Sequence, residues 1–224
     1  MSIFLTQALL EFETAARLGL HDVYDWHQLV WKAFPGRDGQ PRDFLTRLDR
    51  RERERALRLL IVSPRAPVRP ETWPGDAAAW QTREIPPAFF ASPHYRFQLR
   101  ANPTKRDNAT RRRLPLRTDD QLRAWLLRKA EAAGFAVDAD SLHMMQEGRE
   151  WFAKSGHQGS HHAVEFEGRL AVTDRTRFAA AFARGIGSAK AFGFGLLALA
   201  PTADAAQTPW SGEGRAASPQ EPPP

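Results

Sequence analysis

The chain is divided by a proline-rich stretch at residues 63–93, which reads SPRAPVRPETWPGDAAAWQTREIPPAFFASP. Proline fixes its own backbone φ angle and has no amide hydrogen, so repeated prolines exclude a long helix or a central strand. Between Ser63 and Pro93 it contains Pro64, Pro67, Pro70, Pro74, Pro86 and Pro87. We therefore expect an irregular connection between two structured units.

The residues on either side of this connection show a similar order of elements. Before it, the hydrophobic pattern predicts a helix at 22–34 and strands at 3–10, 44–48 and 56–62. After it, the pattern predicts helices at 119–133 and 175–183 and strands at 95–101, near 135, at 163–172 and at 195–200. Units that combine helices with an antiparallel sheet favour an α+β protein of two tandem ferredoxin-like (RRM-like) domains, residues 1–85 and 93–201.

Composition narrows the class of protein. The 224 residues are 42% hydrophobic and 26% charged, which is typical of a globular chain. Residues 202–224 are mostly small, polar or proline, and we expect them to form a disordered tail. The sequence contains neither an apolar run of about 20 residues nor a secretion signal, which predicts a cytoplasmic protein without membrane contact. The absence of cysteine excludes disulfides, thiolate nucleophiles and iron–sulfur clusters.

Charge points to a polyanionic partner. Lysine and arginine number 32 against 26 acidic residues, for a net charge of +6. In the predicted strand at 95–101, Arg96 and Arg100 alternate with apolar residues, so one face is cationic. The loop that follows carries the triplet 111–113, all arginine, which suits phosphate binding but also an ordinary solvated loop. Residues 47–58 mix arginines with acids, and we expect exposed strand faces and a hairpin there, without a function.

The helix predicted at 22–34 carries the first candidate chemistry. At 100° per residue, His27 and Tyr24 fall one turn apart on a flank of the apolar face. An imidazole can exchange a proton near neutral pH, and a neighbouring phenol can donate a hydrogen bond to a reacting oxygen. The alternative is that both side chains simply close the edge of a core.

A glycine-rich segment at 185–197 is the second candidate site. Its glycines let the backbone approach another chain closely, and Lys190 can sit against a phosphate. The order helix, glycines, strand does not match a Walker A or Rossmann loop. His157, His161 and His162 lie near two glycines but lack the spacing and acidic companions of a metal site, so we predict no metal.

Four segments together resemble the CasE family, the CRISPR repeat endoribonucleases of the type I-E Cascade complex. They are Val23-Tyr24-Asp25-Trp26-His27, Phe97-Gln98-Leu99-Arg100-Ala101-Asn102-Pro103-Thr104-Lys105, Phe166-Glu167-Gly168, and the glycine-rich segment at 185–197. They occur in the family's order, and the resemblance covers residues 1–201.

The resemblance implies cleavage of CRISPR precursor RNA at the 3′ base of the repeat hairpin, without a metal or another cofactor. The RNA 2′-hydroxyl attacks the neighbouring phosphorus, and a 2′,3′-cyclic phosphate remains. His27 corresponds to the family's catalytic histidine and Tyr24 to its active-site tyrosine; Lys154, in a loosely aligned basic loop, is our candidate for a transition-state cation. We expect RNA contacts from Arg96, Arg100, Asn102, Lys105, Arg106, Arg111, Arg112, Arg113 and Lys190.

The resemblance also implies partners: precursor and mature CRISPR RNA, and other Cascade subunits, the backbone subunit among them. Two alternatives within such a complex remain, a non-catalytic subunit that binds the RNA hairpin and a purely structural subunit. A metal-dependent nuclease would need clustered carboxylates, which the sequence does not show.

Overall fold

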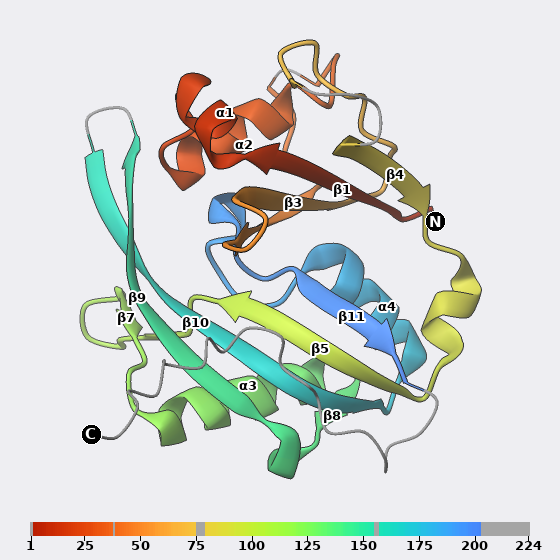
Figure 1. The fold of residues 1–224 in the computed structure, drawn as a ribbon. Helices are drawn as coiled ribbons and strands as arrows, with labels where there is room; N and C mark the ends of the chain where they lie inside the picture. The colour runs from red at the N-terminus through yellow and green to blue at the C-terminus, as the bar shows by residue number, and fades with distance from the viewer. Residues whose placement is uncertain (1, 38, 75–78, 155–156, 203–224) are drawn as a thin grey trace, which may run out of the picture.

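The computed structural model describes residues 2–37, 39–74, 79–154 and 157–202, except for the side chains of residues 152–158. It has two antiparallel sheets stacked one above the other, with helices on their outer sides (Figure 1). The α+β class and the antiparallel sheets predicted from the sequence are confirmed. No helix within these residues has the length and apolar character needed to cross a membrane.

The first sheet contains β1 (Phe4–Glu11), β2 (Leu45–Arg51), β3 (Ala56–Ser63) and β4 (Trp80–Glu84) in the order β2-β3-β1-β4. Helices α1 (Phe12–Arg17) and α2 (Val23–Trp31) both lie between β1 and β2 in the chain. Trp26, Leu29 and Val30 of α2 pack with Leu59 and Ile61 of β3 in one apolar cluster. Burial of this stripe holds α2 on the sheet.

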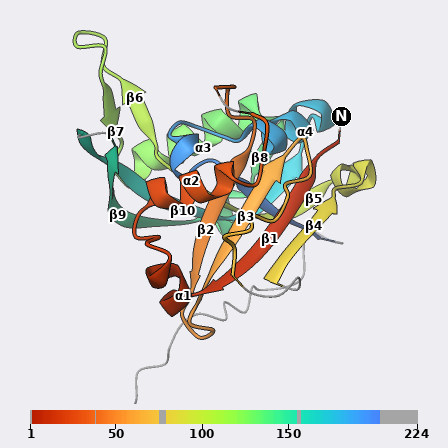
Figure 2. The ribbon, with the colours of Figure 1, turned by 90° about the horizontal axis from the view of Figure 1, so that it is seen from above.

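The second sheet contains β5 (His94–Ala101), β8 (Phe135–Val137), β10 (His157–Val172) and β11 (Leu197–Pro201) in the order β11-β5-β10-β8, with β9 (His143–Lys154) also paired to β10. Helices α3 (Asp119–Ala132) and α4 (Arg175–Arg184) cover its outer face (Figure 1). A short hairpin of β6 (Thr104–Arg106) and β7 (Arg113–Pro115) projects from the body (Figure 2). The 3₁₀ turns are η2 (Pro87–Ala91), η3 (Ala139–Ser141) and η4 (Lys190–Phe192).

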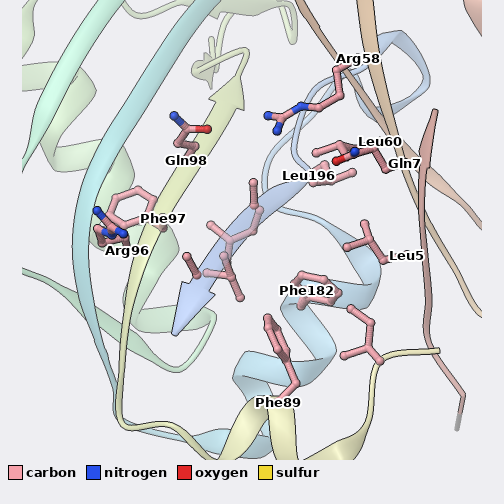
Figure 3. A pocket seen from close by; sticks show the side chains of 15 residues that line it. Leu5, Gln7, Arg58, Leu60, Phe89, Arg96, Phe97, Gln98, Phe182 and Leu196 are labelled. Carbon is pink, nitrogen blue, oxygen red and sulfur yellow. The ribbon is translucent and has the colours of Figure 1, made fainter. Parts of the chain in front are cut away.

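The interface between the inner faces of the two sheets contains a shared apolar cluster and a partly polar cavity. Leu45, Leu60 and Val62 of the first sheet belong to the same buried cluster as Leu196 and Leu197 of the second unit. Beside this contact lies a cavity of about 500 Å³, with apolar residues toward Phe89 and Phe182 and polar side chains toward Arg58 (Figure 3). The two units therefore share part of their core.

The structure confirms most of the predicted elements and corrects others. Within its described residues, 63–74 and 79–93, the proline-rich stretch contains no long helix, as expected, but residues 80–84 form β4 at the edge of the first sheet. The pattern missed β9 entirely and placed the start of β10 at 163 rather than 157. Residues 203–224, the predicted tail, lie outside the described residues.

The prediction for residues 47–58 is wrong at Arg47. The exposed pairs Arg50–Glu52 and Arg51–Glu54 match the expected solvated hairpin, but the Arg47 side chain is only 6% exposed. Its strand face turns toward the second sheet, where Arg47 Nη1 donates to Glu165 Oε1 at 3.0 Å. An alternating charge pattern does not reveal which face another sheet will cover.

Candidate active site

The start of helix α2 fixes the position of its candidate residues. Asp22 Oδ1 accepts hydrogen bonds from the backbone amides of Tyr24 and Asp25, at 2.8 and 3.0 Å. Asp25 Oδ2 accepts in turn from the amide of Asp22 at 3.0 Å, which completes a capping box. Two carboxylates at the positive end of the helix dipole further stabilise this end. The register of Tyr24 and His27 is therefore set by backbone contacts.

His27 is half-buried among aromatic side chains. Trp31 Nε1 donates to His27 Nε2 at 2.9 Å, and the Phe44 ring lies 5.9 Å from the imidazole, centroid to centroid. Because Nε2 accepts this bond, the proton of a neutral ring is on Nδ1, and Nδ1 is itself buried. An RNA substrate can therefore reach Nε2 only if the Trp31 contact is broken.

Tyr24 and Lys154 are the other two candidate catalytic residues. Tyr24 is half-buried in the first turn of α2, one turn before His27. Lys154 is the last residue of β9 and pairs with His157 across the hairpin that joins β9 to β10; its side chain is outside the described part. Helix α2 packs against both β9 and η4. The fold thus brings the helix, the hairpin and the glycine-rich segment together.

The β6–β7 hairpin presents the predicted basic loop to solvent. Arg106 and Arg113 are paired across the hairpin, and Asp107 N donates to Arg112 O at 2.8 Å to close its tip. Arg111, Arg112 and Arg113 are exposed, as are Lys105 and Arg106. Thr110, which donates to the Asp107 carboxylate from its hydroxyl and amide, lowers the pKa of Asp107. The hairpin therefore carries five exposed cations on a fixed turn.

Two polar hollows continue this basic surface onto the body of the second unit. One, of about 460 Å³, includes Arg113, Arg117, Arg149 and Ser188 in its lining. The other, of about 420 Å³, includes Arg106, Arg111, Arg128 and Lys129. Arg128, Lys129, Arg149 and Ser188 were not among the sequence candidates. They come from α3, β9 and the glycine-rich segment, and only the fold brings them together.

Three of the predicted RNA contacts lie on β5 or directly after it, away from the tip of the β6–β7 hairpin. Arg100 donates to Glu147 at 2.7 Å and to Glu150 at 3.0 Å, and stacks over the Phe194 ring. Arg96 is exposed and lines the cavity between the sheets (Figure 3), whose lining includes no residue of the β6–β7 hairpin. Asn102 is 7% exposed, and its side chain lies 2.9 Å from His161 Nδ1. Arg100 is therefore held by two carboxylates, whereas Asn102 also lines the hollow of about 460 Å³ on the basic surface.

Lys190 joins the basic surface to the end of α4. Its Nζ donates to the Arg184 carbonyl oxygen at 2.7 Å, which satisfies a C-terminal acceptor of that helix. Burial lowers the pKa of Lys190, and the nearby charges of Arg42, Arg184 and Lys129 lower it further. Lys190 therefore lies where positive charge is concentrated.

The glycines of the glycine-rich segment serve close packing. Gly195 has φ 87°, and a Cβ there would lie 2.5 Å from the Ile186 carbonyl oxygen. A Cβ on Gly185, φ 74°, would lie 2.8 Å from the Leu45 side chain of β2. The segment thus folds back on itself and against the first unit, beside α2.

A known protein family and two known relatives match this chain over most of its length. A family described as CRISPR associated protein matches residues 3–201. The "CRISPR system Cascade subunit CasE" of Escherichia coli strain K12 is 32% identical over 197 residues, covering 83% of this chain and 96% of that protein. The chain belongs to the CasE/Cse3 family of CRISPR endoribonucleases. The "CRISPR-associated endoribonuclease Cse3" of Thermus thermophilus, another member, is 34% identical over 214 residues, covering 89% and 100%.

Solved structures of CasE/Cse3 members share the fold described above. Cse3 bound to a 19 nt RNA superposes with a TM-score of 0.72 at 31% identity, covering 90% of this chain and all of that one. Thermus thermophilus Cse3 bound to an RNA that represents a pre-cleavage complex gives 0.73 at 32% identity, with the same coverage. Both relatives were thus solved with RNA bound.

Proposed function

We propose that this chain is a metal-independent endoribonuclease. It cleaves CRISPR precursor RNA at the 3′ base of the repeat hairpin and leaves a 2′,3′-cyclic phosphate. The observation that carries the proposal is the position of α2, the helix that holds His27: it packs against η4 and against β9, whose Arg149 lines a hollow of the basic surface. Membership of the CasE/Cse3 family supplies the RNA substrate class.

The cleavage step needs only groups that this chain carries. The 2′ oxygen of the nucleotide before the cut forms a bond to phosphorus, and the bond from phosphorus to the 5′ oxygen breaks. One proton leaves the 2′ oxygen and one is delivered to the 5′ oxygen. His27 exchanges one of these protons, while Tyr24 and Lys154 are proposed to stabilise the charge on the phosphoryl oxygens.

The RNA stem is proposed to lie along the β6–β7 hairpin and the adjoining hollows. Lys105, Arg106, Arg111, Arg112, Arg113 and Lys190 supply phosphate contacts there, and Arg117, Arg128, Lys129 and Arg149 extend the surface. Arg96, which is exposed, and Asn102, which lines one of these hollows, remain candidates; Arg100 does so only if RNA binding releases it from Glu147 and Glu150. The substrate is a polyanion, and such clustered cations provide both affinity and orientation.

The proposal extends to architecture and assembly. Strand orders β2-β3-β1-β4 and β11-β5-β10-β8 support two ferredoxin-like units, at residues 1–85 and 93–201. We propose that the protein keeps its product as a cytoplasmic Cascade subunit and contacts the backbone subunit. The name of the Escherichia coli relative supports the assembly.

One experiment tests the chemistry. The protein is incubated with its cognate repeat RNA in excess chelator, and the products are resolved for length and end group. We expect one cut and a cyclic phosphate, no cut when the 2′-hydroxyl at the site is replaced by hydrogen, and a loss of about 10²–10⁴ in rate for His27→Ala with hairpin binding retained. Full activity of His27→Ala would contradict the assignment. Tight binding without any cut by the unmodified protein would favour the non-catalytic hairpin-binding subunit.

A further inference from the structure

Arg47 and Glu165 form a buried bridge between the two units. Their side chains are 6% and 5% exposed, and Arg47 Nη1 lies 3.0 Å from Glu165 Oε1. Arg47 Nε also donates to Asp49 Oδ1 at 2.7 Å, and Asp49 is held by Arg58 of β3 at 2.6 Å. The bridge thus joins β2 to β10, which cross one above the other (Figure 2).

Strand β2 and the residue before it are also in contact with the catalytic helix. Phe44 packs against the His27 ring with centroids 5.9 Å apart and against Trp31 at 5.1 Å. Leu45, the next residue, meets Gly185 of the glycine-rich segment. Three residues beyond Phe44, the same extended chain presents Arg47 to Glu165.

Glu165 lies on β10, which pairs with β5, β8 and β9 in the sheet of the proposed RNA-binding unit. Strand β10 pairs with β9, whose last residue is Lys154, and His161 of β10 contacts Asn102. A shift of β2 against β10 would therefore move His27 relative to Lys154 and the basic surface. Proton transfer is sensitive to such shifts, because a misplacement of about 1 Å can cost about 10²-fold in rate.

We propose that Arg47 and Glu165 are positioning residues for RNA cleavage, which fix helix α2 and His27 against the RNA-binding unit. This inference rests on the proposed ribonuclease function. Buried ion pairs are often replaceable by apolar side chains without loss of stability, so stability alone does not explain one here. Asp49, on the same strand, holds the Nε side of the Arg47 guanidinium, and Nη1 bonds Glu165 on β10, so the bridge fixes the distance between β2 and β10.

The decisive variant replaces the bridge without leaving a buried charge. Arg47→Met with Glu165→Leu is expected to fold with an unchanged or higher Tm, because Asp49 keeps its bond to Arg58. At saturating protein, we expect its single-turnover cleavage rate to fall about 10-fold or more, while the Kd for a repeat hairpin RNA with a 2′-deoxy cut site changes less than about 2-fold. Arg50→Met with Glu52→Leu is the matched control, since that exposed pair lies in and just beyond β2.

A geometric readout separates positioning from a general loss of structure. The chain has no cysteine, so Gln28→Cys on α2 and Glu131→Cys on α3, both exposed, accept a single pair of spin labels. We expect the distance distribution between them to broaden or shift in the bridge variant and not in the control. Glu165→Gln alone keeps an acceptor for Arg47, so this variant should retain most of the cleavage rate that the bridge variant loses.

Each result of these experiments either supports or contradicts the inference. If the bridge variant has a normal cleavage rate or a normal distance distribution, the inference is wrong. The proposed function still stands in that case, provided that the wild-type protein cuts its RNA. No cutting by the wild-type protein would instead overturn the proposed function. If the double variant does not fold, Arg47→Lys replaces it, because lysine keeps the charge but cannot span Asp49 and Glu165 together; an unchanged rate there would equally overturn the inference.

Discussion

At the scale of single residues, the contact between Trp31 and His27 is the feature that bears most directly on catalysis. The indole donates to His27 Nε2, and a protonated imidazole could not accept that bond. The structure therefore shows an imidazole whose Nε2 is covered by the Trp31 indole. Binding of the substrate has to displace the indole or turn the imidazole before a proton can move through Nε2.

The variant Trp31→Phe tests whether the indole blocks access to His27 Nε2. Phenylalanine keeps an aromatic packing surface against Phe44 but has no hydrogen-bond donor. The substrate then reaches Nε2 without breaking a hydrogen bond. We expect hairpin binding to be unchanged and the single-turnover rate to rise about 5-fold, in line with a net hydrogen bond of about 1 kcal/mol. The rates are measured at saturating protein. A rate that falls as far as that of His27→Ala would show instead that Trp31 orients the ring.

Glu165 makes stability depend on pH in an unusual direction. Burial raises the pKa of its carboxyl from 4.5 to about 7, and Arg47 only partly opposes that shift. Between these values the folded protein binds more protons than the unfolded chain, so this group's contribution is fully present below about pH 4.5 and is lost as the pH rises through about 7.

Glu165→Gln should remove this dependence, since the amide does not titrate. Measured by urea unfolding, the variant should lose less stability than the unmodified protein between pH 4.5 and 7, by a difference on the order of 3 kcal/mol. Asp138→Asn is a suitable control, because its pair with Arg169 is partly exposed. Parallel pH curves for the unmodified protein and Glu165→Gln would contradict the raised pKa.

At the scale of elements, the β6–β7 hairpin should account for much of the salt dependence of RNA binding. Arg111, Arg112 and Arg113 are exposed on it. Each phosphate contact releases counterions, so Kd depends steeply on salt. Changing all three to glutamine should weaken binding and reduce the slope of log Kd against log salt by up to about 3. The same change at Arg50, Arg51 and Arg53 is the control. An unchanged slope would place the RNA stem elsewhere.

The elements also show what sequence reasoning reached and where it stopped. Strong periodicity predicted α2 and the positions of Tyr24 and His27 on it correctly, because that signal is local. Strand β9 was missed because its exposed side chains, such as Met145 and Trp151, show no regular inward and outward alternation. Arg47 was misjudged because its partner Glu165 lies 118 residues away, and the bond of Arg100 to Glu147 was not foreseen because 47 residues separate them.

At the scale of the whole molecule, the separation of binding from chemistry predicts a protein that keeps its product. The proposed stem contacts lie on the β6–β7 hairpin and its adjoining hollows, whereas His27 is on the other unit. A stem bound there is the same in substrate and product, so its binding energy does not favour release after the cut.

Product release should therefore limit turnover. With repeat RNA in several-fold excess, the amount of product should level off near the protein concentration, and the cut RNA should co-elute with the protein on gel filtration. Raising the salt concentration weakens phosphate contacts and should restore turnover, which separates retention from inactivation. A chain ending at residue 201, where the family match ends, should give the same plateau. Many rapid turnovers at low salt would instead indicate a freestanding processing ribonuclease that releases its RNA.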